Sequence, residues 1–155
     1  MKAFIGYVSM SGNTEDIANA LKEGLLQKGC EVEMGNLDEI ESNSVLDYDC
    51  IFIGTYTWGD GDLPYEAEDF FYELDSLDLT GKYAACFGSG DYAYPKFCRA
   101  VDVFSQKLEE RGCHVFVQKL KVEFAPETDE KVMECQKFAQ SVIEWMVETK
   151  EAELV

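Results

Sequence analysis

The stretch from Lys2 to Gly29, "KAFIGYVSMSGNTEDIANALKEGLLQKG", decides the fold because a strand, a polar loop and a helix follow one another in it. Its first part is apolar at the centre, as in strands that are buried on both faces of a sheet. Its last part repeats apolar residues at helical spacing and stops at Gly29. A strand that passes directly into a helix predicts one unit of an α/β fold.

The same alternation continues to the end of the chain. Strands are expected at 2–9, 30–37, 50–57, 82–90 and 113–124, and helices at 14–29, 65–77, 95–112 and 128–150. No linker, repeat or low-complexity segment interrupts the pattern. Five strands alternating with helices imply a parallel sheet with right-handed crossovers and helices on both faces. We therefore predict a single doubly wound α/β domain over residues 1–155 with a five-stranded parallel sheet.

Composition limits the classes of function. With 46% hydrophobic residues, the chain of 155 residues can fold around a core rather than remain a disordered acidic tail. The net charge of −18 argues against binding to nucleic acid or to an anionic membrane surface, because both are bound through Lys and Arg. The charge has two interpretations, namely docking of a basic partner or solubility alone.

The cysteines indicate a reducing compartment. The chain has six of them without a C-x-x-C pair, and most lie in apolar segments. We expect buried free thiols in a cytoplasmic protein rather than a disulfide framework. A zinc site is not expected, because His114 is the only histidine and ligand spacing is absent. Neither a signal peptide nor an apolar run near the ~20 residues of a membrane helix is found.

Ligands of doubly wound folds bind beyond the carboxyl ends of the strands, and three strand exits are rich in polar and glycine residues. The first, "SMSGNT", offers hydroxyls, an asparagine amide and Gly12 at a helix N-terminus, where backbone N–H groups are unpaired. This donor set suits a terminal phosphate, although a helix cap alone is the alternative. A Walker loop is excluded because the G-K-[ST] ending is absent, and a G-x-G-x-x-G turn is absent too.

The second exit, "TYTWGDGD", and the third, "GSGDYAYPKFC", supply aromatic side chains. Trp58 stands among glycines just past a strand, where it either covers the sheet edge or stacks on a flat ligand. Tyr92 and Tyr94 follow a flexible Gly-Ser-Gly sequence. A second aromatic wall opposite Trp58 would form a slot for a planar ring whose phosphate tail reaches the first loop.

With the motifs "SMSGNTE", "TYTWGDGDLP" and "GSGDYAYPKFC" in this order, the chain resembles the flavodoxins over essentially its whole length. These are small electron-transfer proteins that carry FMN. The resemblance implies the strand order 2-1-3-4-5. The fifth strand runs into "APETDE" without a long insertion, which is typical of short-chain members. Met10 departs from the pattern, because many members have a hydroxyl residue there.

The resemblance also implies the binding residues. The loop from Ser9 to Thr14 would surround the phosphate together with Thr57, and Trp58 and Tyr94 would flank the isoalloxazine ring. Backbone groups of Gly90 and Asp91 would line the pyrimidine edge. The full implied set for FMN is Ser9, Met10, Ser11, Gly12, Asn13, Thr14, Tyr56, Thr57, Trp58, Gly59, Asp60, Ser89, Gly90, Asp91, Tyr94 and Cys98. Tyr92 has no clear counterpart, and neither catalytic nor metal-binding residues are implied.

The implied function is that of a low-potential one-electron carrier that uses the semiquinone/hydroquinone couple of non-covalently bound FMN. In the family, the peptide after the residue matching Gly59 turns over on reduction. Carboxylates near the ring, such as Asp60 and Asp62, would lower the potential. The implied partners are a ferredoxin/flavodoxin–NADP reductase-type donor and redox acceptor enzymes with basic docking faces. The protein would be a cytoplasmic monomer without substrate turnover of its own.

Three other functions are compatible with parts of the sequence to different degrees. A flavodoxin-like, FMN-dependent NAD(P)H or quinone oxidoreductase is the main alternative, but only Arg99 and Arg111 are available to clamp a nicotinamide phosphate. A receiver module switched by aspartyl phosphorylation is excluded, because "SMS" and "TYT" stand where its acidic residues would be. A role as an accessory flavoprotein of ribonucleotide reductase stays open.

Overall fold

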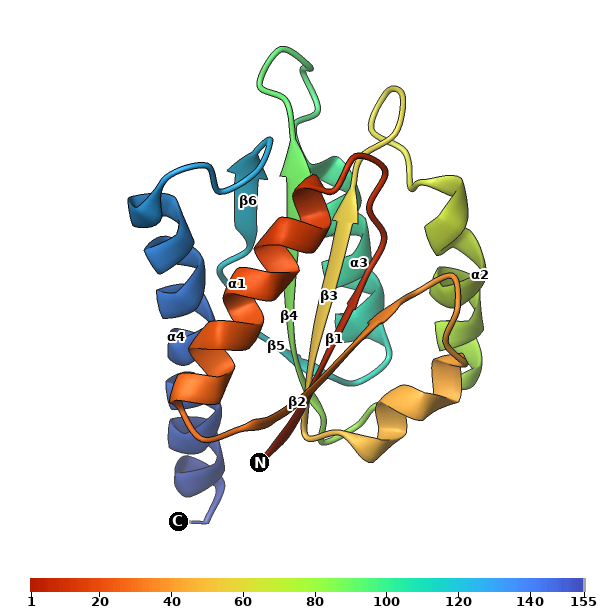
Figure 1. Ribbon diagram of the computed structural model, residues 1–155. Helices are drawn as coiled ribbons and strands as arrows, with labels where there is room; N and C mark the ends of the chain where they lie inside the picture. The colour runs from red at the N-terminus through yellow and green to blue at the C-terminus, as the bar shows by residue number, and fades with distance from the viewer. Residues whose placement is uncertain (155) are drawn as a thin grey trace.

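A computed structural model describes residues 1–154 of the chain, which form a parallel sheet between two layers of helices (Figure 1). The elements in order are β1 (Lys2–Tyr7), α1 (Asn13–Gln27), β2 (Glu31–Asn36), the 3-10 helix η1 (Ser42–Asp47), β3 (Cys50–Tyr56), α2 (Tyr65–Glu73), the 3-10 helix η2 (Leu74–Ser76), β4 (Tyr83–Gly90), α3 (Arg99–Glu110), β5 (His114–Val115), β6 (Leu120–Glu123) and α4 (Asp129–Glu153).

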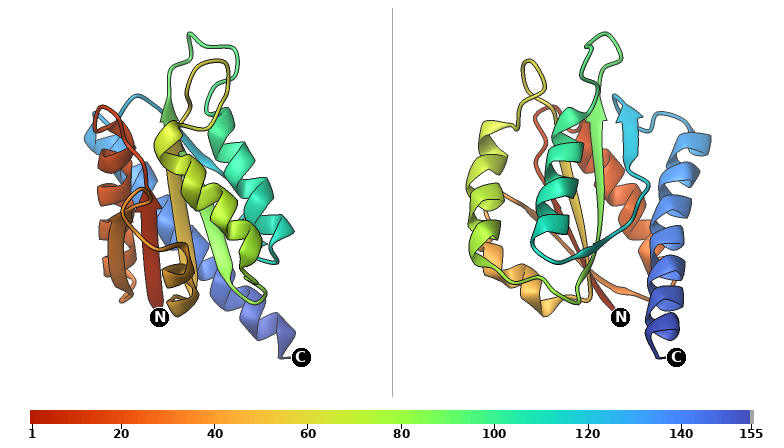
Figure 2. Two further views of the ribbon diagram at one scale, coloured as in Figure 1. Left: turned by 90° about the vertical axis from the view of Figure 1, so that its right-hand side faces the viewer. Right: turned by 180° about the vertical axis from the view of Figure 1, so that it is seen from behind.

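The sheet has the order β2-β1-β3-β4-β5 with parallel pairs, which confirms the predicted doubly wound topology. Helices α1 and α4 cover one face, and α2 and α3 cover the other (Figure 2). Alternate residues of β3 therefore enter different cores, because successive side chains of a strand point to opposite faces. Phe52 packs with α1 and α4, whereas Ile51 and Ile53 pack with α2 and α3.

The edge strand expected at 113–124 is divided into β5 and β6, both paired with β4. Val115 pairs with Ala84 and Leu120 with Phe87, so residues 116–119 stand opposite residues 85–86 alone. The two extra residues on this strand leave the hydrogen-bonded ladder, and Val117 is 89% exposed. Such bulges are common at sheet edges, where they hinder pairing with another chain. The sheet thus has six strand segments in the predicted order.

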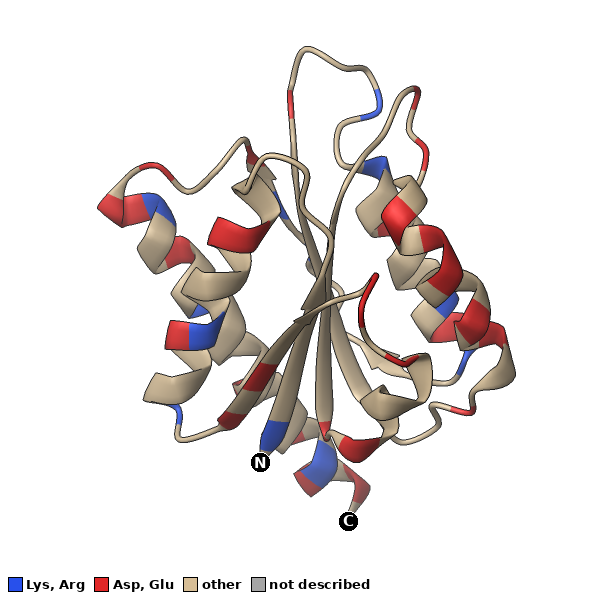
Figure 3. Ribbon diagram, turned by 45° about the vertical axis from the view of Figure 1, so that its right-hand side comes forward, with Lys and Arg blue, Asp and Glu red and all other residues tan. Residues whose placement is uncertain are grey.

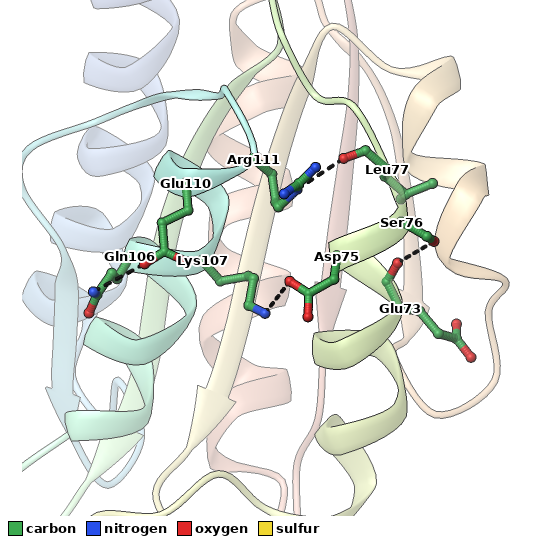
Figure 4. Close-up of polar contacts among 8 residues, drawn as sticks. All are labelled: Glu73, Asp75, Ser76, Leu77, Gln106, Lys107, Glu110 and Arg111. Atoms are coloured by element: carbon green, nitrogen blue, oxygen red, sulfur yellow. Dashed lines mark hydrogen bonds and ion pairs between the residues drawn. The ribbon is translucent and has the colours of Figure 1, made fainter.

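Helix α3 begins at Arg99 and not at Pro95, so the predicted start of this helix is wrong. Cys98, directly before it, has a left-handed backbone with φ of 53°, which a continuing helix does not allow. Further along, the ammonium of Lys107 pairs with Asp75 at 2.5 Å, and Arg111 donates to the carbonyl of Leu77 at 3.1 Å (Figure 4). These contacts hold α3 against η2.

The predicted state of the cysteines is confirmed, since all six are buried and free. In the part of the chain that the structure describes, no helix is long and apolar enough to cross a membrane.

Candidate functional site

The loops after β1, β3 and β4 meet at one end of the sheet (Figure 1), where two adjoining hollows open. The first has a volume of about 160 Å³ and is lined by Ser9, Met10, Ser11, Asn13, Thr14, Tyr56, Thr57, Ser89, Gly90, Asp91, Tyr94 and Phe124. The second, of about 40 Å³, is lined by Thr57, Gly59, Asp60, Gly61, Gly90, Asp91, Tyr94, Pro95, Lys96, Phe97 and Cys98. Four shared residues make the hollows parts of one site.

The loop after β1 presents unpaired backbone N–H groups. Within residues 1–154, the amides of Met10, Ser11, Asn13 and Thr14 have no hydrogen-bond partner. Gly12 is the N-cap of α1 with φ of 92°, a conformation that glycine adopts without strain, and no side chain caps the helix at this position. The hydroxyl of Ser9 accepts from the amides of Gly12 and Glu15, yet these four amides stay unpaired, so the loop is not only a helix cap.

A buried hydrogen bond fixes this loop to the next part of the site. The hydroxyls of Thr14 and Ser89 lie 2.7 Å apart, and both residues are buried. The bond joins the first turn of α1 to the end of β4. Ser9 contributes within the loop, since its hydroxyl accepts from the amide of Gly12 at 3.1 Å.

The exit of β3 is tied to the two helices on the other face. Tyr56 donates its hydroxyl hydrogen bond to Glu66 at 2.6 Å, and burial together with this bond raises the pKa of Tyr56. The hydroxyl of Thr57 accepts from the amide of Ala100 at 3.0 Å, in the first turn of α3. Thr57 therefore lines both hollows while its hydroxyl is engaged with α3.

The turn that follows is a small hairpin. Trp58 and Asp62 exchange two backbone hydrogen bonds of 2.8 Å, and Gly59 and Gly61 between them have φ of 52° and 96°. The side chain of Trp58 is 55% exposed and lines neither hollow. It borders a wider concavity of about 550 Å³ together with Tyr65.

This position of Trp58 bears on two expectations. A lid on the sheet edge would be buried, and Trp58 is not. Tyr94 lines both hollows, but the structure does not place Trp58 across from it. The predicted aromatic slot is therefore not formed by these two side chains as they lie, and its closure around a ring stays a prediction.

The exit of β4 packs closely around Gly90. A Cβ at this position would lie 2.8 Å from the Sγ of Cys98 and 3.0 Å from the ring of Phe97, so glycine is needed there. Cys98 itself is 1% exposed, and burial raises the pKa of its thiol to about 12. This thiol serves packing and is not a nucleophile at neutral pH.

Sequence reasoning missed five residues that line the hollows, namely Gly61, Pro95, Lys96, Phe97 and Phe124. Ligands of doubly wound folds bind beyond the carboxyl ends of the strands, and Phe124 follows the end of β6. The same rule could therefore have identified Phe124. Lys96 is the one cation among the lining residues in the described part of the chain, and its ammonium lies 3.5 Å from the carboxylate of Asp60.

All the predicted residues except Gly12 and Trp58 line one hollow or the other. The unpaired amides and the nearby hydroxyls at the start of α1 are suited to an anion, and no lysine or arginine lines this hollow. Beside it, Tyr94 offers an aromatic face. The donors suit a phosphate and the aromatic face suits a planar ring, so together they fit a planar group with a phosphate tail. The role of each residue toward FMN stays a prediction. Among residues 1–154, no group of three or more possible metal ligands is found.

Comparisons with known proteins agree on one family. The flavodoxin family profile matches residues 5–138. The "Probable flavodoxin 1" of Bacillus subtilis (strain 168) is 51% identical over 144 residues, which cover 93% of this chain and 91% of the relative. The flavodoxin of Maridesulfovibrio salexigens is 39% identical over 138 residues, covering 84% and 92%. The crystal structure of oxidised Flavodoxin 2 from Bacillus cereus superposes with a TM-score of 0.90 at 47% identity, covering 93% of this chain and 99% of that one.

Proposed function

Because the chain belongs to the flavodoxin family, we propose that it carries single electrons at low potential from a reductase to acceptor enzymes. The chain binds FMN, as flavodoxins do, and it is an electron-transfer protein rather than an enzyme. We place the FMN in the two adjoining hollows. The observation that carries this proposal is the anion site of unpaired amides at the start of α1, which contains no cation.

FMN supplies the redox chemistry, and the chain supplies binding, orientation and the electric field. Neutral donors in the loop from Ser9 to Thr14 hold a phosphate without adding positive charge close to the ring. Asp60 and Asp91 line the hollows and disfavour further negative charge there. The nearby cation Lys96 is paired with Asp60. This field lowers the potential and supports the role of an electron donor.

The surface beside Trp58 supports docking of a basic partner. Helix α2 carries Glu66, Glu68 and Asp69 and has no Lys or Arg, and acidic residues recur on this side of the molecule (Figure 3). Trp58 and Tyr65 add exposed aromatic area, with exposed fractions of 55% and 84%. Aromatic residues are enriched in the cores of protein interfaces, and complementary charge speeds association.

We infer from this surface a ferredoxin/flavodoxin–NADP reductase-type donor and acceptors with basic faces. The family and the free thiols support a cytoplasmic location, in which the protein acts as a monomer.

The test is the rate of electron transfer from such a reductase as a function of ionic strength. The rate should fall steeply as salt rises, because screening shortens the reach of surface charges. The double variant Glu68→Gln/Asp69→Asn should transfer more slowly at low salt and show a flatter dependence. Glu148→Gln/Glu151→Gln in α4 is the matched control and should behave as the wild type. A rate that does not change with salt would contradict steering by this surface.

A further inference from the structure

Two residues other than glycine have a positive φ within residues 1–154, namely Cys98 at 53° and Phe124 at 58°. A left-handed backbone is strained for residues with a Cβ and is unusual for a bulky one. Each of the two lines one of the hollows. Strained conformations persist where the surroundings enforce them, and they gather at functional sites. Cys98 packs beside Gly90, but no sequence motif gives Phe124 a role.

The ring of Phe124 belongs to neither core. It is 44% exposed, and it is absent from both clusters of packed hydrophobic residues and from the aromatic pairs. Instead, Phe124 lines the first hollow together with Tyr94 and the loop from Ser9 to Thr14, which we call the phosphate-binding loop. Packing of the fold therefore does not explain why a large ring stands at a strained position.

The backbone around Phe124 is held at two points. Its amide donates to the carbonyl of Gly90 at 2.8 Å, one residue beyond the last pair of the β4–β6 ladder. The carboxylate of the preceding Glu123 accepts from the amide of Tyr92 at 3.0 Å. The exit of β6 is thereby fixed to the loop after β4, which forms the other wall of the site.

We propose that Phe124 is a positioning residue of the FMN site, whose ring forms an apolar wall beside the phosphate-binding loop. The wall limits access of water to the unpaired amides of Ser11, Asn13 and Thr14. Hydrogen bonds from these amides to a phosphate strengthen where water is excluded, because the local dielectric constant is lower. The inference rests on the proposed placement of FMN in this hollow.

The experiment compares three variants of the apoprotein. Phe124→Ala removes the ring and keeps the strained Cβ, Phe124→Gly removes both, and Phe124→Leu keeps apolar bulk. Dissociation constants for FMN and for riboflavin, which lacks the phosphate, are measured by quenching of flavin fluorescence. Thermal midpoints are measured without flavin. Val117→Ala, at an exposed apolar residue of the same edge, is the matched control.

We expect Phe124→Ala to weaken FMN binding about threefold to tenfold, as for the loss of one aromatic contact. The loss for riboflavin should be smaller, and Phe124→Leu should restore most of the FMN affinity. Phe124→Gly should melt about 2–4 °C above Phe124→Ala, since glycine relieves the backbone strain, and it should bind FMN no more tightly. Val117→Ala should change neither quantity. Stability should therefore rise from alanine to glycine without a gain in FMN affinity.

Three results would overturn the inference: unchanged FMN affinity in Phe124→Ala, an equal loss for both flavins, or a midpoint for Phe124→Gly no higher than that of Phe124→Ala. The placement of FMN is checked separately with Asn13→Asp, which sets a carboxylate beside the phosphate. If that variant also binds FMN as the wild type does, the proposed site is wrong, whereas its failure to bind combined with a neutral Phe124→Ala refutes only the role of Phe124.

Discussion

Two loops at the same end of the sheet differ in how they are held and in their charge. The loop from Ser9 to Thr14 is anchored by the buried bond between Thr14 and Ser89, and it presents neutral donors. The loop from Trp58 to Asp62 is closed by its own backbone bonds, carries two carboxylates, and leaves its tryptophan 55% exposed. The difference agrees with the proposed division of roles, in which the first loop would bind the cofactor and the second would adjust its potential and contact partners.

The largest expected effect tests the neutrality of the first loop. Asn13→Asp places a carboxylate beside the phosphate, and two like charges about 4 Å apart repel by roughly 4 kcal/mol at an effective dielectric constant near 20. We expect the dissociation constant for FMN to rise by about two to three orders of magnitude, as measured by fluorescence titration of the apoprotein. Urea unfolding should show no loss of stability, since an acidic residue suits the first turn of a helix.

The next effect tests the anchor. Thr14→Val leaves the hydroxyl of Ser89 buried without its partner, so the free energy of unfolding should fall by about 1–3 kcal/mol. The double variant Thr14→Val/Ser89→Ala should recover part of this loss, because no polar group is then left unpaired. Urea denaturation of the apoproteins measures both. An additive loss in the double variant would mean that the bond does not anchor the loop.

A smaller effect concerns the backbone of the second loop at Gly59. Among residues 1–154, the only atom within 4 Å of a Cβ added at Gly59 is a carboxylate oxygen of Asp62 at 3.7 Å, so Gly59→Ala meets no obstacle other than the positive φ. A Cβ penalises the left-handed backbone state by about 1–2 kcal/mol. The two one-electron potentials should therefore approach one another by about 40–90 mV in a redox titration. Unchanged potentials would remove the role of this glycine.

The smallest effect concerns the carboxylates of the second loop. Neutralising one charge about 10 Å from the ring should raise the more negative potential by about 17 mV. Asp60→Asn should exceed Asp62→Asn, because Asp60 lines the second hollow and its loss frees Lys96. Both shifts should shrink at high salt, since the side chain of Asp60 is 87% exposed. Equal potentials in the wild type and both variants would leave the second loop without an electrostatic role.

Much of the fold follows from local pattern. A strand with an apolar centre followed by a helically spaced segment occurs four times, and this alternation is enough to predict the layers and the parallel sheet. The 3-10 helix η1 was not predicted. Val45 is the one buried residue in its span, and a single buried residue gives no periodic apolar pattern. The start of α3 was misplaced, since the left-handed backbone of Cys98 has no signature in a helical pattern.

For the site, sequence motifs located the loops but not their contacts. Thr57 was expected at the phosphate, and its hydroxyl lies at the start of α3. Trp58 was expected across from Tyr94; it borders a concavity shared with α2 and α3, and its place beside a bound ring stays a prediction. Such orientations depend on partners that are remote in sequence, as Thr57 and Ala100 are, and no local pattern records them.

The sequence by itself determined the order of strands and helices, the polar loops at the strand ends and the negative charge, because each of these is a property of short segments or of composition. Only the tertiary structure decided that the edge strand is interrupted, that Thr14 meets Ser89 across 75 positions, and that Phe124 lines the first hollow. These features arise where segments far apart in the chain are brought within hydrogen-bonding or van der Waals distance. Their physical cause is the packing of the whole domain.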